Sequence, residues 1–317
     1  MYAAEYKVIR HMKTILGSGI FNLDRVFVRE YPLGPQHSRT YDEKFVVEEA
    51  GGTCGNVMCM LAHFGWQTFP QVVLDNSEEG HKIAESLKNY GCNCEFVSNV
   101  EGGGTTFLNV IHKLNADGSP KVSVRTGSPG GSRFPKRHFL RLRDEAPAFL
   151  QALDFVPEVF FFDDSAAGNR LLASELGSKG SLVYFEPSAI KEKKDFESVR
   201  LSDIIKFSGE NVPDSSFVDD YKDKLFIQTL GGDGLRFNLR GEGWVNLPPV
   251  ENDNVVDWEG AGDWTTSAFL NELAKADALS IKRLTADVVK AALEKAQIVA
   301  SKSVSFMGSK GMINQAV

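Results

Sequence analysis

The sequence predicts an α/β protein with a central, mostly parallel sheet flanked by helices. Short apolar runs of strand length alternate along the chain with amphipathic segments of helix length. The apolar runs are continuous, as expected of parallel strands that are covered on both faces. Strands that alternate apolar and polar residues are confined to two regions, and they indicate a second, smaller sheet.

The expected strands of the central sheet cover residues 14–20, 68–74, 158–162, 181–186, 203–208 and 224–230. The expected helices cover residues 52–64, 77–90, 168–178, 263–275 and 286–303. The last helix shows the helical period best, because Val289, Ala292 and Leu293 begin a series that recurs at three and four residues. Thr285 is its expected N-cap.

The small sheet is predicted from two segments with a period of two. One is "LDRVFVREYP" (23–32), and the other is "TTFLNVIHKLNADGSPKVSVR" (105–125), in which "NADGSP" is a hairpin turn. We expect a small antiparallel sheet that projects from the main domain, with strands from about 24–50 and 104–126. Residues 12–317 then form one domain, and residues 1–11 form an N-terminal extension.

Composition and charge exclude several classes of partner. The net charge is −7 without a long run of either sign, which argues against a nucleic-acid surface or an anionic membrane partner. The apolar runs are too short to cross a bilayer, and the N-terminus lacks the pattern of a secretion signal. The four cysteines lack zinc-ligand spacing and are expected to be reduced thiols. We therefore expect a cytoplasmic protein.

The stretch "VVDWEGAGDWTTSAFL" (255–270) places small residues at the start of a helix. Gly260, Ala261 and Gly262 would let an anion approach the free N–H groups of the first turn. A carboxylate beside a bound anion does not help to bind it, so Asp263 is expected to have a different function. Phosphoryl transfer would give it one, since a carboxylate can take the proton of an attacking hydroxyl. The alternative is a plain helix start in which the dipole stabilises an Asp.

Three further motifs precede this one in a fixed order. They are "GSGIFNLD" (17–24), "GGTCGNVMCMLAHFG" (51–65) and "TLGGDG" (229–234), followed by "DWEGAGD" (257–263). With these motifs the sequence resembles the ribokinase-like, PfkB-type carbohydrate kinases from about Lys13 onward. The resemblance implies the ribokinase-like fold, in which the small sheet forms a lid over the sugar.

The resemblance also implies roles for the matching residues. Asp263 is the catalytic base, and Gly260, Ala261 and Gly262 form the anion hole for the transferred phosphoryl group. The expected sugar-binding residues are Asn22, Asp24, Gly52, Thr53 and Asn56. The expected nucleotide-binding residues are Ser208, Thr229, Gly231 and Gly234. Asp257 matches the first Asp of the signature, which helps hold a monovalent cation in some members, so K⁺ is an expected cofactor beside ATP and Mg²⁺.

The sequence departs from the family pattern at several positions. Trp258 and Glu259 replace the usual residues before the glycines, and Trp264 follows the base, so large rings are expected near the wall of the site. The segment "SGEN" (208–211) places Ser208 and Asn211 where the family has Asn and Glu. Glu210 is then the expected Mg²⁺ residue. The segment "RTGSPGGSRFP" (125–135) is either a surface loop or a cap over the substrate.

The sequence thus predicts an enzyme that uses ATP to phosphorylate a hydroxyl of a small-molecule sugar. We expect the protein to bind neither a nucleic acid nor a membrane. Two copies of the chain are expected to form a homodimer through the lid. Two alternatives stay open. One is a nucleoside kinase of the same family, and the other is a sugar-binding sensor whose altered signature has weakened catalysis.

Overall fold

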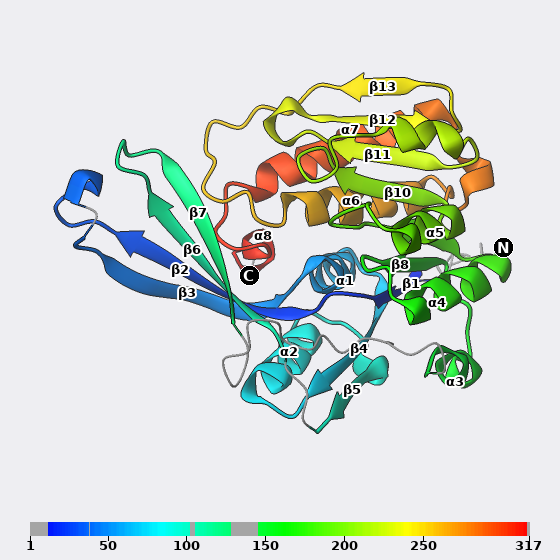
Figure 1. Ribbon diagram of the computed structural model, residues 1–317, viewed down its shortest axis with the longest axis horizontal. Coiled ribbons are helices and arrows are strands. Elements are labelled where there is room, and N and C mark those ends of the chain that lie inside the picture. The colour runs from blue at the N-terminus through cyan, green and yellow to red at the C-terminus, as the bar shows by residue number, and fades with distance from the viewer. Residues whose placement is uncertain (1–11, 38, 102–104, 128–144, 316–317) are drawn as a thin grey trace, which may run out of the picture.

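The computed structural model describes residues 12–37, 39–101, 105–127 and 145–315. The expected extension over residues 1–11 lies outside the described residues, and so does most of the Gly-rich segment 125–135. The described chain forms one large sheet covered by helices and one small sheet that extends away from it (Figure 1).

The large sheet has the order β13-β12-β11-β10-β9-β8-β1-β4-β5 within the described residues. Its strands are β1 (Thr14–Ser18), β4 (Gln67–Asp75), β5 (Val97–Val100), β8 (Val159–Phe162), β9 (Leu182–Phe185), β10 (Ile204–Ser208), β11 (Leu225–Thr229), β12 (Leu235–Leu239) and β13 (Trp244–Leu247). Neighbours from β5 to β11 pair in parallel, while β12 and β13 are antiparallel at one edge. The mostly parallel sheet predicted from the continuous apolar runs is therefore confirmed.

Helices cover both faces of this sheet. The helices on one face are α1 (Thr53–His63), α2 (Glu78–Asn89), α6 (Ala261–Lys275) and α7 (Ala286–Ser303). The helices on the other face are α3 (Glu145–Ala152), α4 (Ala167–Ser178) and α5 (Lys193–Leu201). Thr285 caps α7 as expected, since its side chain accepts a hydrogen bond from the Val288 N–H.

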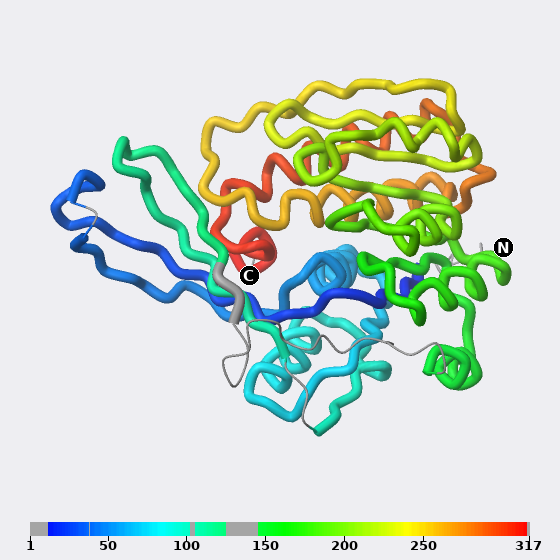
Figure 2. The backbone as a smooth tube through the Cα atoms, in the orientation of Figure 1, coloured from blue at the N-terminus to red at the C-terminus, as the bar shows by residue number. Residues whose placement is uncertain are grey.

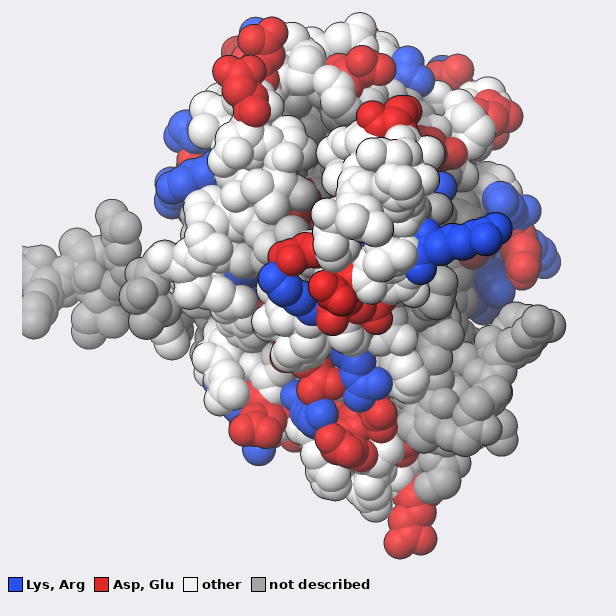
Figure 3. All heavy atoms as spheres, turned by 90° about the vertical axis from the view of Figure 1, so that its left-hand side faces the viewer, with Lys and Arg blue, Asp and Glu red and all other residues white. Residues whose placement is uncertain are grey.

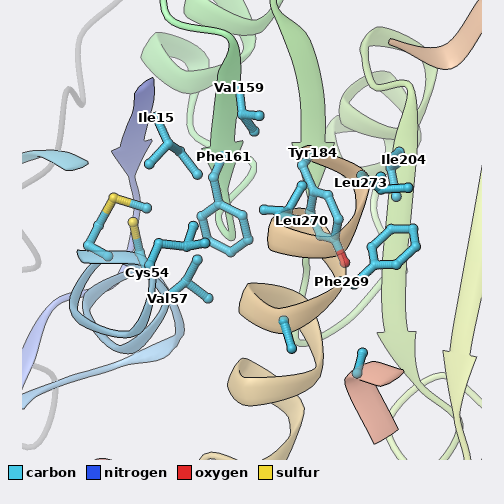
Figure 4. Close-up of a cluster of buried hydrophobic side chains, with 14 of the residues drawn as sticks. Ile15, Cys54, Val57, Val159, Phe161, Tyr184, Ile204, Phe269, Leu270 and Leu273 are labelled. Atoms are coloured by element: carbon cyan, nitrogen blue, oxygen red, sulfur yellow. The ribbon is translucent and has the colours of Figure 1, made fainter. Parts of the chain in front are cut away.

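The core under α1 and α6 fixes both helices against the middle of the sheet (Figure 4). Phe161 and Tyr184 point from β8 and β9 toward these helices, and Phe269 packs against them from α6. All three side chains are fully buried. Since α1 and α6 both begin at the motif residues, the core holds two of the four motifs in place.

The small sheet has the order β3-β2-β6-β7. Its strands are β2 (Asn22–Glu30), β3 (Asp42–Gly51), β6 (Phe107–Leu114) and β7 (Pro120–Gly127). The prediction of an antiparallel sheet is wrong at its centre, because β2 and β6 pair in parallel. Two hairpins, β2–β3 and β6–β7, lie side by side with their first strands in the same direction, a pairing that local turn signals do not reveal.

The backbone trace shows that the small sheet is rooted next to the large domain and that its far end projects from it (Figure 2). On the face that bears this projection, acidic and basic side chains are interspersed without a broad patch of one sign (Figure 3). Among the described helices, none is long and apolar enough to cross a membrane.

The two tryptophans of the signature have different environments. Trp264 is fully buried, packs against Phe64 and Met60, and donates its Nε1–H to the Ser309 carbonyl oxygen at 2.9 Å. Trp258 is 48% exposed. The Trp264 ring thus supports the backbone of Ser309, a residue that lines the cavity described below, without lining that cavity itself.

We expect Trp264→Ala to lower the free energy of unfolding by about 3–5 kcal/mol, because it leaves a large cavity in the core. The matched control Trp258→Ala should lower it by about 1 kcal/mol or less, because about half of that side chain is already exposed to solvent. Urea denaturation measures both values. Similar losses for the two variants would contradict the packing described for Trp264.

Candidate active site

A cavity lies between the root of the small sheet and the edge of the large sheet where the parallel strands end. The small sheet lines it with Asp24, Val26 and Val110. The start of α1 contributes Thr53 and Asn56. Gly260 and Asp263 line it from the start of α6, so residues from three of the four motifs meet there. Ligands of open parallel sheets bind at this edge.

Asp263 lies in the first turn of α6 and is 9% exposed. One carboxylate oxygen accepts a hydrogen bond from the Asn56 amide at 2.7 Å. Burial raises the pKa of Asp263 to about 8, and the negative charge of Glu186 adds to the rise. The Asn56 hydrogen bond and the charges of Lys206 and Lys310 oppose it. Such a carboxyl group can exchange a proton near neutral pH, as a general base must.

The turn before α6 is built from small residues, so an anion can come close to its backbone. Gly260 has φ 80°, and a Cβ at this position would lie 2.7 Å from the Ser309 Cβ, so only glycine fits. The Ala261 N–H donates to the Trp258 carbonyl oxygen at 3.2 Å. In the first turn, the N–H groups of Gly262 and Asp263 therefore remain for an anion, because they have no partner within the helix.

Asp24 faces the cavity from the first residues of β2. Its Oδ1 accepts a hydrogen bond from the Asn22 amide at 2.6 Å, so Asn22 orients Asp24 and is not itself part of the cavity lining. Burial raises the pKa of Asp24 to about 7, and Lys310 opposes this rise. A Cβ on Gly51 would lie 1.8 Å from the Asp24 Oδ2, which explains a glycine at that position of β3.

A buried ion pair that sequence analysis missed joins the two sides of the cavity. Lys310 and Glu49 are 0% and 2% exposed, and the Lys310 Nζ lies 3.2 Å from a Glu49 oxygen. The same Nζ donates to the Asn56 Oδ1 at 2.6 Å. Asn56 is thereby oriented so that its amide nitrogen faces Asp263. No pattern in the sequence marks Lys310, which precedes the short helix α8 (Gly311–Asn314).

Asp163 is a second residue that sequence analysis missed. It follows β8 and is 5% exposed, and its carboxylate accepts hydrogen bonds from the N–H groups of Ile20 and Cys54 at 2.8 and 2.9 Å. Burial raises its pKa to about 7. A Cβ on Gly19 would lie 2.0 Å from the carboxylate. Asp163 therefore ties the end of β1 to the start of α1.

The expected nucleotide residues lie farther along the same edge of the sheet. Ser208 and Thr229 end the neighbouring strands β10 and β11 and are paired in register. Gly231 follows with φ 59°, and Gly234 has φ 91° at the turn into β12. A Cβ on Gly234 would lie 2.4 Å from the Leu247 carbonyl oxygen, so this glycine is needed for the turn itself.

The two residues expected to bind metal ions, Asp257 and Glu210, have different surroundings. Each oxygen of the buried Asp257 carboxylate accepts a backbone N–H at 2.9 Å, from Glu259 and from Gly308. The His112 Nε2 lies 3.2 Å from the second oxygen, although it is not aligned as a hydrogen bond. These contacts hold the Asp257 carboxylate in place, and the K⁺ site expected there stays a prediction.

Glu210 is exposed, and its N–H donates to the Ser208 Oγ at 3.2 Å. Within the described chain no group of three or more His, Cys, Asp or Glu residues could hold a metal ion. Mg²⁺ that arrives with a nucleotide needs few protein ligands, because phosphates and water complete its coordination. The exposed carboxylate of Glu210 is compatible with that mode of binding.

The fold is shared with solved structures of sugar and nucleoside kinases. Solved structures that match nearly the whole chain include the Xylella fastidiosa fructokinase with bound ATP (17% identity, TM-score 0.69, 94% of both chains covered). They also include Arabidopsis thaliana ribokinase complexed with ribose and ATP (19%, 0.67, 94% of this chain and 95% of that one). The Methanocaldococcus jannaschii nucleoside kinase, an archaeal member of the ribokinase family, matches at 17% and 0.66 over 94% of both chains. The chain therefore has the ribokinase-like fold.

The family comparison agrees with this class. The model of the pfkB family carbohydrate kinases matches residues 215–314, which contain "TLGGDG" and "DWEGAGD". The resemblance inferred from the motifs is thus confirmed. No curated protein matches the sequence.

The buried base predicts a pH-dependent effect on stability. The folded chain holds the proton of Asp263 more tightly than the unfolded chain, whose Asp pKa is 3.8. The free energy of unfolding therefore falls as pH rises from about 4 to about 8. Asp263→Asn removes this loss, so the variant should gain at least ~1 kcal/mol relative to wild type between pH 5 and pH 9.

Urea denaturation at the two pH values tests this. Asp253→Asn, a change at an exposed position, is the matched control and should show no such gain. If the difference between Asp263→Asn and wild type stayed constant with pH, Asp263 would titrate alike in the folded and unfolded chains.

Proposed function

We propose that the protein is an ATP-dependent kinase that phosphorylates a hydroxyl group of a neutral sugar. The observation that carries this proposal is the position of Asp263. Its carboxylate faces the cavity, and it lies in the same helical turn as the N–H groups left for an anion. A proton acceptor and a phosphoryl site then lie within one turn of helix, as transfer to a bound hydroxyl requires.

In this mechanism the acceptor hydroxyl binds in the cavity and donates its hydrogen bond to the Asp263 carboxylate. The hydroxyl oxygen attacks the γ-phosphorus of ATP, the bond to the β,γ-bridging oxygen breaks, and the proton passes to Asp263. ADP carries away the bonding electrons. The N–H groups of Gly262 and Asp263 stabilise charge on the transferring group. Mg²⁺ bound to the nucleotide would neutralise phosphate charge, and we propose the exposed carboxylate of Glu210 as its protein ligand.

The charge of the cavity favours a neutral acceptor. Of the described residues that line it, five carry carboxyl groups and none is Lys or Arg; the five are Asp24, Glu49, Asp257, Glu259 and Asp263. Such a lining repels sugar acids and sugar phosphates and suits hydroxyl donors. Val26, Leu108 and Val110 add an apolar wall from the small sheet, which can cover the face of a sugar ring. We propose that this sheet acts as a lid that excludes water.

A nucleoside acceptor is the main alternative, since a ribose hydroxyl meets the same requirements. A sugar sensor without catalysis is a further alternative. The intact pair of Asp263 and Gly262 argues against the sensor, because sugar binding alone does not need a base beside an anion site.

Two further features belong to this proposal. The small sheet exposes Phe45 and Val124, at 59% and 50%, and we propose that two copies of the chain associate through it. All four cysteines are free thiols, which suits a protein of the cytoplasm.

The first test measures ADP release with ATP and a panel of ketoses, aldoses, sugar acids and nucleosides. We expect a neutral sugar to stimulate release and Asp263→Asn to lower kcat by at least ~10²-fold, because the base is lost. For wild type, kcat/KM should rise with pH and level off above about 8, since the base must be ionised.

Asp253→Asn is again the control and should retain wild-type turnover. Normal turnover of a folded Asp263→Asn variant would eliminate Asp263 as the base. Stimulation by nucleosides alone would favour the alternative acceptor.

The second test concerns Asp24. We expect Asp24→Ala to raise the KM for the sugar by about 10- to 100-fold, because it removes a charged hydrogen-bond acceptor worth roughly 1.5–3 kcal/mol. ATP affinity without sugar should not change, because Ser208 and Thr229 lie outside the cavity. Asp42→Asn, at an exposed position of the same small sheet, is the control. Equal weakening of both ligands, measured by calorimetry, would show that Asp24 is structural.

A further inference from the structure

A buried lysine lies beneath the start of α6 and has no role in the mechanism above. Lys206 is in β10, two residues before Ser208, and is 3% exposed. Its Nζ pairs with Glu186, the residue that follows β9 and is 9% exposed. The second oxygen of Glu186 accepts a hydrogen bond from the Thr266 hydroxyl at 2.6 Å. Lys206, Glu186 and Thr266 thus lie where two strand ends meet α6.

The ammonium group of Lys206 is adjacent to the anion turn. A Cβ built on Gly262 would lie 3.6 Å from the Lys206 Nζ, and no other neighbour lies within 4 Å of it. Gly262 itself is exposed. A group that approaches the Gly262 N–H from the open side would therefore find the ammonium beside it. Lys206 is also close enough to Asp263 for its charge to lower the pKa of that carboxyl group.

A purely structural role explains this pair poorly. Removing two charges from water costs free energy that their mutual attraction does not reliably return, so a buried ion pair is weak evidence for stability. Here both charges lie at the carboxyl edge of the sheet, where ligands of this fold class bind. The Lys206 Nζ has three hydrogens, and among the described residues Glu186 is the partner that the structure gives it.

We propose that Lys206 is a further catalytic residue, which binds a non-bridging oxygen of the transferring γ-phosphoryl group beside Gly262. This inference rests on the proposed kinase activity. Glu186 holds the ammonium in position before the nucleotide binds, and Thr266 holds Glu186. As the hydroxyl oxygen bonds to phosphorus and the bond to ADP breaks, Lys206 donates a hydrogen bond to the phosphoryl group and keeps its proton. The proton of the hydroxyl goes to Asp263.

The test uses Lys206→Met, with Lys224→Met as the matched control. Lys224 is a second buried lysine, next to β11 and 6% exposed. Its Nζ donates to the backbone carbonyl oxygens of Arg200 and Ser202 and lies 3.6 Å from a carboxylate oxygen of the exposed Asp223. Lys224 directly precedes β11, whereas Ser208 ends the parallel strand β10, so the two residues lie at opposite ends of the strands. Both variants lose a buried ammonium, and one of them loses it at the phosphoryl site.

Calorimetry with Mg²⁺ and either ADP or the β,γ-imido analogue of ATP separates the γ-phosphoryl group from the rest of the nucleotide. We expect Lys206→Met to bind ADP within about 3-fold of wild type and to bind the analogue at least ~10-fold more weakly, with kcat lowered by ~10²–10³-fold. Lys224→Met should preserve both affinities and kcat. Equal binding of the analogue by Lys206→Met and wild type would overturn the proposal.

Lys206→Met leaves Glu186 unpaired and can fail to fold. The double variant Lys206→Met/Glu186→Gln removes the orphaned charge and should show the same selective loss of analogue binding. Since binding is measured without an acceptor, the result does not depend on turnover. If wild type turned over no acceptor but Lys206 still distinguished the analogue from ADP, the proposed sugar kinase would fail while the phosphoryl contact stood.

Discussion

The site depends on one constraint: a carboxylate must remain ionisable while it is enclosed by protein. Asp263 is buried, and burial together with Glu186 raises its pKa to about 8. Without the groups that oppose this rise, the pKa would be higher still, and less of the ionised form that a base needs would be present near neutral pH. The Asn56 amide and the two buried lysines supply the compensation, one lysine on the acceptor side and one beside the anion turn.

This arrangement explains why residues far apart in the chain converge. Asn56 is held by Lys310, and Lys310 is held by Glu49, so the end of β3, the start of α1 and the chain end share one network. Figure 1 shows α8 next to the root of the small sheet, where this network lies. A lid that moved would carry Glu49 with it. The contacts of Glu49 and Lys310 thus connect the proposed lid to Asn56, which donates its hydrogen bond to Asp263.

The sequence predicted the features that leave local patterns. Continuous apolar runs predicted β1, β4, β8, β9, β10 and β11 of the large sheet, and the glycines before Asp263 predicted the tight turn at the start of α6. Pairings between distant segments left no such pattern. The parallel contact between β2 and β6 and the ion pair between Lys310 and Glu49 join residues more than 80 positions apart, and tertiary packing alone defines them. For Trp264 the sequence predicted a ring near the wall of the site, but its position next to Asp263 does not tell whether the ring faces the cavity or the core behind it.

The ionisation of Asp263 can be observed directly. Carbon-13 NMR of Asp carboxyl groups, recorded from pH 5 to pH 10 for wild type and for Asp263→Asn, assigns one resonance by its absence from the variant. The midpoint of that resonance should lie near 8, as burial beside Glu186 requires. A midpoint near the ordinary Asp value of about 4 would contradict the central claim, because burial and Glu186 would then not outweigh the groups that lower the pKa of Asp263.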